Sequence, residues 1–150
     1  MKARPARRRG KAVPSGSAPR IHTLRRPFLS STVVSVAVVK QTTATVFAGV
    51  NSGFNHLIRP MFYESYHHIS NLTNPKGTGR LYTVVGNICE TDTFAWDRRL
   101  PEIHEGDLLA FHNAGAYGFE MSSSFNSRTR PAEVLLTAAD GEPRLIRQRQ

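Results

Sequence analysis

Cysteine is almost absent from the sequence: Cys89 is the only one in 150 residues. One thiol cannot form a disulfide within the chain, so the sequence gives no sign of an oxidising compartment, and we expect a cytoplasmic protein. Long apolar runs are absent as well, because no segment approaches the roughly 18 residues that a membrane-spanning helix requires. The six histidines and the cysteine lack the close spacing of a metal-ligand set, so we predict no bound metal.

Acidic residues are missing from the first 31 positions, which hold nine Lys and Arg residues. From Thr32 to Gln150, eleven basic residues balance eleven acidic ones, so the whole net charge of +9 lies in the N-terminal segment. Its Pro, Gly, Ser and Arg content predicts a disordered basic extension over 1–31, followed by one folded domain over 32–150. Three interpretations of the extension stay open: a solvated or non-native tail, a nucleic-acid-binding arm, or a targeting segment.

The remainder of the chain consists mainly of short apolar or alternating runs separated by Gly, Asn and Pro. These runs predict strands at 31–39, 44–50, 81–88, 107–112, 117–121, 132–137 and, as a seventh, 143–148. Residues 59–69 predict a helix, with Pro60 in its first turn. We therefore expect a mainly β fold, an antiparallel sandwich or barrel with one or two short helices.

Five residues are candidates for chemistry, namely Arg59, Tyr63, Cys89, Glu90 and Tyr117. Arg59 and Tyr63 share one face if they lie on a helix, and a guanidinium there can bind a carboxylate; a surface Arg beside a packed Tyr is the alternative. Cys89 stands next to Glu90, whose charge favours the neutral thiol, a poor nucleophile but a usable acid; a buried, inert Cys is the alternative. Tyr117 follows glycine in a segment where the backbone could approach a ligand closely.

Three ordered segments carry a resemblance to a known family. They are "VNSGFNHLIRPMFYESYHHI", "VVGNICETDTFAWDRRLPEIHEGDLLAFHNAGAYGFEMSS" and "FNSRTRPAEVL". Together they resemble the C-terminal part of the diaminopimelate decarboxylases, from about Val33 to Leu136. The resemblance implies a C-terminal β-sandwich domain of homodimeric enzymes that use pyridoxal phosphate to convert meso-2,6-diaminopimelate to L-lysine and CO₂.

The resemblance also implies a role for each candidate residue. Arg59 and Tyr63 would hold a substrate carboxylate, and Tyr117 would contact both cofactor and substrate. Cys89 would be the general acid that protonates the α-carbon after CO₂ leaves, and Glu90 would bind the distal amino group. These last two would reach into the partner subunit's site. The turn that follows them departs from the family, because Thr91-Asp92-Thr93 stands where Ser-Gly-Asp is usual.

The cofactor-binding barrel of that family has no counterpart in this sequence. The lysine that attaches the cofactor is missing with it, since Lys40 and Lys76 lie in or beside sandwich segments. We therefore expect a C-terminal fragment that is inactive by itself, with a barrel domain or a second copy as partner and a small amino acid as substrate. Half of a split decarboxylase acting on another basic amino acid, or a basic nucleic-acid-associated protein, are the alternatives.

Overall fold

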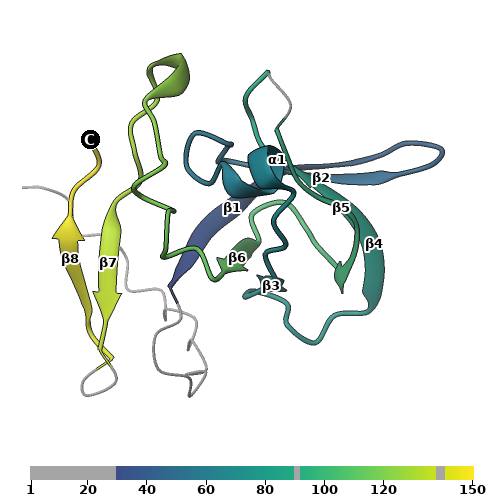
Figure 1. Cartoon of the computed structure of the whole chain (residues 1–150). Coiled ribbons are helices and arrows are strands. Elements are labelled where there is room, and N and C mark those ends of the chain that lie inside the picture. Colours follow the sequence, from purple (N-terminus) through teal and green to yellow (C-terminus); the bar gives the residue numbers. More distant parts are fainter. Residues whose placement is uncertain (1–29, 90–91, 138–140) are drawn as a thin grey trace, which may run out of the picture.

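The computed structural model describes residues 30–89, 92–137 and 141–150 of the chain. Two sheets and two short helical segments make up the described part (Figure 1). The elements in chain order are β1 (Ser31–Gln41), β2 (Val46–Val50), α1 (Arg59–Tyr63), β3 (Ile69–Asn71), β4 (Gly79–Val85), β5 (Thr93–Pro101), β6 (Leu108–His112), the 3-10 helix η1 (Phe125–Ser127), β7 (Glu133–Leu136) and β8 (Pro143–Arg147).

Six strands form the larger sheet, in the order β3-β6-β1-β2-β4-β5. Its two edge strands, β3 and β5, lie against each other, so the sheet curls into a nearly closed barrel. Alternate side chains of each strand point inward, and the core combines branched aliphatic residues with the paired rings of Phe94 and Phe111, whose centroids are 4.7 Å apart. The expected mainly β fold is thus confirmed.

Strand β1 holds the two halves of this barrel together. Its first half pairs antiparallel with β6, and its second half pairs antiparallel with β2. A register shift between Val36 and Val38 marks the change from one partner to the other. Such an irregularity bends a strand, which allows one continuous strand to turn the corner of a barrel.

One strand pair is parallel, in a sheet that the sequence predicts to be antiparallel. β2 and β4 run in the same direction, with Phe47 opposite Thr83 and Gly49 opposite Val85. Parallel neighbours need a long crossover, and the segment between these two strands supplies it. That crossover contains α1 and β3, so the helix with Arg59 is positioned by the connection between two core strands.

The β7–β8 hairpin is a separate two-stranded sheet that stands beside the barrel (Figure 1). Arg147 joins its strands through an ion pair with Glu133 at 2.8 Å, and the Arg147 guanidinium lies 3.8 Å from the centre of the Phe119 ring. The hairpin is therefore attached to the segment that contains Tyr117. Its aliphatic side chains are largely exposed.

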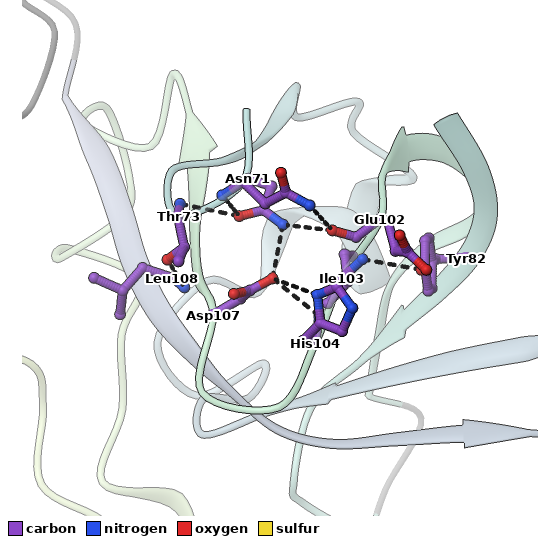
Figure 2. A network of polar contacts seen from close by, with 9 residues as sticks. Asn71, Thr73, Tyr82, Glu102, Ile103, His104, Asp107 and Leu108 are labelled. Carbon is purple, nitrogen blue, oxygen red and sulfur yellow. Dashed lines mark hydrogen bonds and ion pairs between the residues drawn. The ribbon is translucent and has the colours of Figure 1, made fainter. Parts of the chain in front are cut away.

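A buried polar network fixes the turn between β5 and β6 to β3 (Figure 2). The Asp107 carboxylate accepts hydrogen bonds from the Asn71 side chain and from the His104 backbone N–H, both at 2.9 Å. Asn71 also donates to the Glu102 carbonyl, and the Tyr82 hydroxyl accepts from the Ile103 N–H.

Among the described residues, no helix is long and apolar enough to cross a membrane.

Several predicted elements differ from the observed ones. The helix predicted over 59–69 ends at Tyr63, because Glu64 takes a left-handed conformation with φ of 54°, and β3 follows from Ile69. The strand predicted over 117–121 is a series of turns that starts with Tyr117 at φ of 61°. Strand β5 and strand β3 have no counterpart among the predicted strands. Of the predicted extension over 1–31, only the last two residues lie within the described part, and Ser31 already belongs to β1.

Candidate functional site

Arg59 is the first residue of helix α1. It follows a tight turn in the segment that connects β2 to this helix. Pro60 occupies the first turn of the helix, where its missing N–H removes no hydrogen bond. Arg59 and Tyr63 are the first and last residues of this single turn, so both side chains project from the same face. The neighbouring Phe62 ring packs edge-on against Tyr63 with centroids 4.9 Å apart, which restricts the orientation of the phenol.

Tyr117 reaches the same place from a different part of the chain. Its left-handed backbone starts a turn in which its carbonyl accepts the Met121 N–H. A Cβ on Gly118 would overlap the Ala114 carbonyl, so this tight turn depends on glycine at that position. The Tyr117 side chain is left 61% exposed, and the Arg59 guanidinium lies 5.7 Å from the centre of its ring.

An open hollow of about 220 Å³ lies between these side chains and is lined by Arg59, Tyr63, Tyr117 and Met121. One arginine, two tyrosines and one methionine thus border one small volume. Such a set recognises an anionic group, because the guanidinium donates paired hydrogen bonds to a carboxylate or phosphate and each phenol adds a further donor. The residue types that line the hollow are therefore compatible with an anionic ligand.

Cys89 lies on the loop between β4 and β5, and its side chain is exposed. The interpretation of this thiol as a buried core residue is therefore wrong. In Figure 1 this loop rises at the same end of the barrel as α1, and α1 itself contacts β5. Cys89 does not line the hollow, and Glu90 lies outside the described residues.

Asp92 closes the loop that carries Cys89. Its carboxylate is buried and accepts the Phe54 N–H at 2.6 Å through Oδ1 and the Ile88 N–H at 2.9 Å through Oδ2, while its backbone carbonyl accepts the Gly86 N–H at 2.7 Å. Burial raises the pKa of Asp92 and is the dominant cause, while the two N–H donors and the positive charge of Arg128 oppose it.

The turn that contains Phe54 also holds the segment that follows Met121. The Asn55 carbonyl accepts the Ser123 N–H at 2.8 Å, and the rings of Phe54 and Phe125 pack with centroids 4.9 Å apart. His56 Nε2 donates to the Thr129 carbonyl at 3.0 Å, and its Nδ1 accepts from the Ser52 hydroxyl at 2.9 Å. Burial lowers the pKa of His56, which favours the neutral ring that this hydrogen-bond pattern requires.

The structure thus brings three of the five predicted site residues together, namely Arg59, Tyr63 and Tyr117. Sequence reasoning missed Met121, although its position four residues after Tyr117 places it on the same turn. It also assigned no role to Asp92, which the sequence shows only as a departure from a familiar motif. No local pattern in the sequence distinguishes Asp92. Its position between two backbone segments is visible only in the folded structure.

Comparison with known proteins identifies relatives of this chain in sequence and in fold. Residues 29–115 match the family model described as pyridoxal-dependent decarboxylase, C-terminal sheet domain. A diaminopimelate decarboxylase from Methanothermobacter thermautotrophicus is 54% identical over 106 residues, which cover 69% of this chain and 24% of that protein. The chain therefore spans about a quarter of the length of this relative.

Solved structures give the same result. The crystal structure of AQ1208 from Aquifex aeolicus superposes with a TM-score of 0.74 at 42% identity, covering 79% of this chain and 29% of the other. A diaminopimelate decarboxylase from Helicobacter pylori, complexed with L-lysine, superposes with a TM-score of 0.72 at 35% identity, covering 80% of this chain and 29% of the other.

Proposed function

Because the chain belongs to the pyridoxal-dependent decarboxylases through their C-terminal sheet domain, we propose that residues 32–150 serve as that domain in a diaminopimelate decarboxylase. The reaction would convert meso-2,6-diaminopimelate to L-lysine and CO₂. The observation that carries the proposal is the meeting of Arg59, Tyr63 and Tyr117 at one hollow.

Diaminopimelate has a carboxylate and an amine at each end, so the end that does not react must be recognised by charge. The Arg59 guanidinium would bind the carboxylate of that end, with the Tyr63 hydroxyl as a second donor. Glu90, which lies outside the described residues, would bind the amine. A substrate without a carboxylate at its far end would leave Arg59 without a binding partner. The combination of Arg59 and Glu90 therefore favours diaminopimelate over ornithine or arginine.

Pyridoxal phosphate, when bound, supplies the electron sink that allows an amino acid to lose CO₂. The residues of the hollow fit one edge of such a group, through the exposed Tyr117 ring and hydroxyl and the nearby positive charge of Arg59. Among the described residues that line the hollow there is no lysine, so attachment of the cofactor would fall to another part of the enzyme.

Cys89 would deliver the proton that the α-carbon needs after CO₂ leaves. A proton donor must reach the reacting atom, and the exposed position of Cys89 on the β4–β5 loop suits that task. The thiol does not line the hollow of its own chain, so it would act across an interface. We accordingly propose a homodimer, or a complex with a cofactor-binding barrel domain, in the cytoplasm.

A chimaeric enzyme tests this function. In the Methanothermobacter relative, the segment that matches this chain would be replaced by the corresponding residues of this chain. The chimaera is expected to release CO₂ from meso-2,6-diaminopimelate and not from ornithine or arginine. A folded chimaera that binds pyridoxal phosphate but releases no CO₂ from diaminopimelate would contradict the proposal, and the unaltered relative is the control.

A further inference from the structure

We propose that Asp92 is a positioning residue: its carboxylate fixes the loop that carries Cys89 to the turn that leads into the helix of Arg59. The inference rests on the proposed function, because a fixed position for the thiol matters if Cys89 delivers a proton. Asp92 itself faces neither the hollow nor the solvent, since it is only 7% exposed.

The hydrogen bonds of Asp92 connect two segments that are far apart in the sequence. Oδ2 accepts from Ile88, the residue directly before Cys89, and Oδ1 accepts from Phe54, which is 38 residues away in the chain. The bond between the Asp92 carbonyl and the Gly86 N–H closes the loop at its base. The thiol therefore lies on a loop that ends at Asp92. Asp92 bonds to the first residue of this loop, Gly86, and to one internal residue, Ile88.

The backbone packs closely around the Asp92 carboxylate. A Cβ built on Gly86 would overlap the Asp92 carboxylate, and a Cβ on Gly53 would lie 2.9 Å from Asp92 Oδ2 and 2.6 Å from the end of Ile88. Both glycines therefore allow the backbone to approach the carboxylate closely. The carboxylate is enclosed between two backbone segments, as expected for a group that holds them in register.

The Phe54 turn connects this arrangement to the hollow. Two residues of the turn hold the segment after Met121, through the Asn55 carbonyl and the Phe54 ring, and the chain continues from the turn directly into Arg59. Displacement of the turn would therefore move the carboxylate-binding side chains relative to the thiol. Asp92 bonds to both the turn and the loop, and the Asn87 N–H adds a hydrogen bond from the loop to the Ser52 carbonyl at 3.0 Å.

Alkylation of Cys89 by iodoacetamide measures the position of the loop, because this chain contains no other thiol. Asp92→Asn keeps the size of the side chain, but its amide has one acceptor oxygen for two N–H donors, so the Phe54 or the Ile88 bond is lost. Loss of a hydrogen bond to a charged group shifts a local equilibrium by about tenfold. Because Cys89 is already exposed, the variant alters the surroundings of the thiol more than its access, and we expect the alkylation rate constant of the folded chain to change by more than twofold and up to about that factor.

Asp107→Asn is the matched control. Asp107 is also buried and also accepts a backbone N–H, but its network lies at the β5–β6 turn and includes no residue of the Cys89 loop (Figure 2). It should lower the thermal midpoint of unfolding and leave the alkylation rate within about twofold of the unaltered chain. Equal alkylation rates in the two variants, whether both raised or both unchanged, would overturn the proposal.

A measurement on the unaltered chain covers the case in which Asp92→Asn does not fold. The amide proton signals of Phe54, Ile88 and Cys89 should shift together with pH as Asp92 is protonated, with a midpoint above the ordinary value for Asp because burial raises its pKa. The charged groups nearest Asp92 are Arg128 and His56, and His56→Gln separates the histidine titration from this curve. A Cys89 signal that does not follow the other two would overturn the proposal. Neither measurement needs cofactor or substrate, so failure of the decarboxylase assignment would leave both results valid.

Discussion

The Arg59 guanidinium lies 5.7 Å from the centre of the Tyr117 ring, although the two residues belong to separate turns of the chain. The contact holds a positive charge over an aromatic face at the mouth of an open hollow. It also leaves the N–H groups of the guanidinium available to a ligand, since a cation–π contact uses the charge and not the hydrogen-bond donors. This pair of residues therefore borders the hollow and leaves the guanidinium in a position to bind an anion, as the proposed function requires.

Arg59→Lys should weaken diaminopimelate binding more than it slows turnover. Lysine keeps the charge but cannot form two parallel hydrogen bonds to a carboxylate, which costs about 1.5–3 kcal/mol, or roughly tenfold or more in KM. The measurement is KM and kcat for CO₂ release by the chimaeric enzyme. Arg80→Lys is the matched control, because Arg80 lies on β4 against Tyr82 and Gln41 and does not line the hollow. A similar KM for the two variants would rule out carboxylate binding by Arg59.

Cys89→Ser should lower kcat by a factor of about 10²–10⁴ and change KM little. The hydroxyl is a much weaker acid than the thiol, so proton delivery suffers while the substrate still meets Arg59. Asn87→Ala, at an exposed position on the same loop, should keep most of the activity. Turnover that persists in Cys89→Ser would remove the proton-donor role.

Asp107→Asn should lower the free energy of unfolding by about 1–3 kcal/mol, because the Asn71 amide and the His104 N–H both donate to Oδ2 and a neutral amide oxygen accepts each bond more weakly than a carboxylate does. The same exchange at exposed Asp97 should have little effect, since asparagine tolerates the positive φ of 42° found there. Urea unfolding followed by circular dichroism compares the two. Equal free energies would show that the network in Figure 2 contributes nothing to stability.

Stability should fall as the pH is lowered from neutral. Burial lowers the pKa of His56 and of His112 in the folded state, so the unfolded chain binds more protons once the pH drops below the ordinary histidine value of 6.5. The stability contributed by each neutral ring is present above that pH and is lost as the pH falls toward the folded-state pKa. Thermal midpoints at several pH values should show this slope, and His56→Gln should reduce it.

The His56→Gln variant also tests whether the histidines cause the loss of stability at lower pH. Glutamine can donate to the Thr129 carbonyl and accept from Ser52, so the hydrogen bonds survive while the titration disappears. Replacement of His112 as well should flatten the curve further. An unchanged slope in the double variant would show that neither histidine governs acid stability.

The sequence predicted the mainly β fold and most strands because alternation of apolar side chains is a local property. It predicted no strand over 93–101, where Asp97 and two arginines interrupt the alternation and where a register shift accommodates the positive φ of Asp97. It placed a strand over 117–121 because Tyr117 and Phe119 alternate with smaller residues. The left-handed Tyr117 backbone, which rules out a strand, depends on contacts with distant residues.

In the candidate site too, the sequence predicted what local spacing determines and missed what distant contacts determine. Arg59 and Tyr63 could be paired from their spacing, since one helical turn sets their relation. Their meeting with Tyr117 follows from the family resemblance and not from any local pattern. The role of Asp92 could not be predicted from the sequence, because its two side-chain partners precede it by 38 and by four residues and meet only in the folded chain.

Strand β1 also determines the order in which the barrel can form. The β4–β5 pair joins neighbouring strands across a short loop, whereas the Ser31 and His112 side chains that meet at the β1–β6 pair are 81 residues apart. Closing so long a loop carries an entropic cost that only the completed contacts repay, which slows folding. On the ribosome, the first half of β1 must therefore wait until β6 has been synthesised, whereas its second half can pair at once with β2, and the unpaired half offers an open strand edge during that interval.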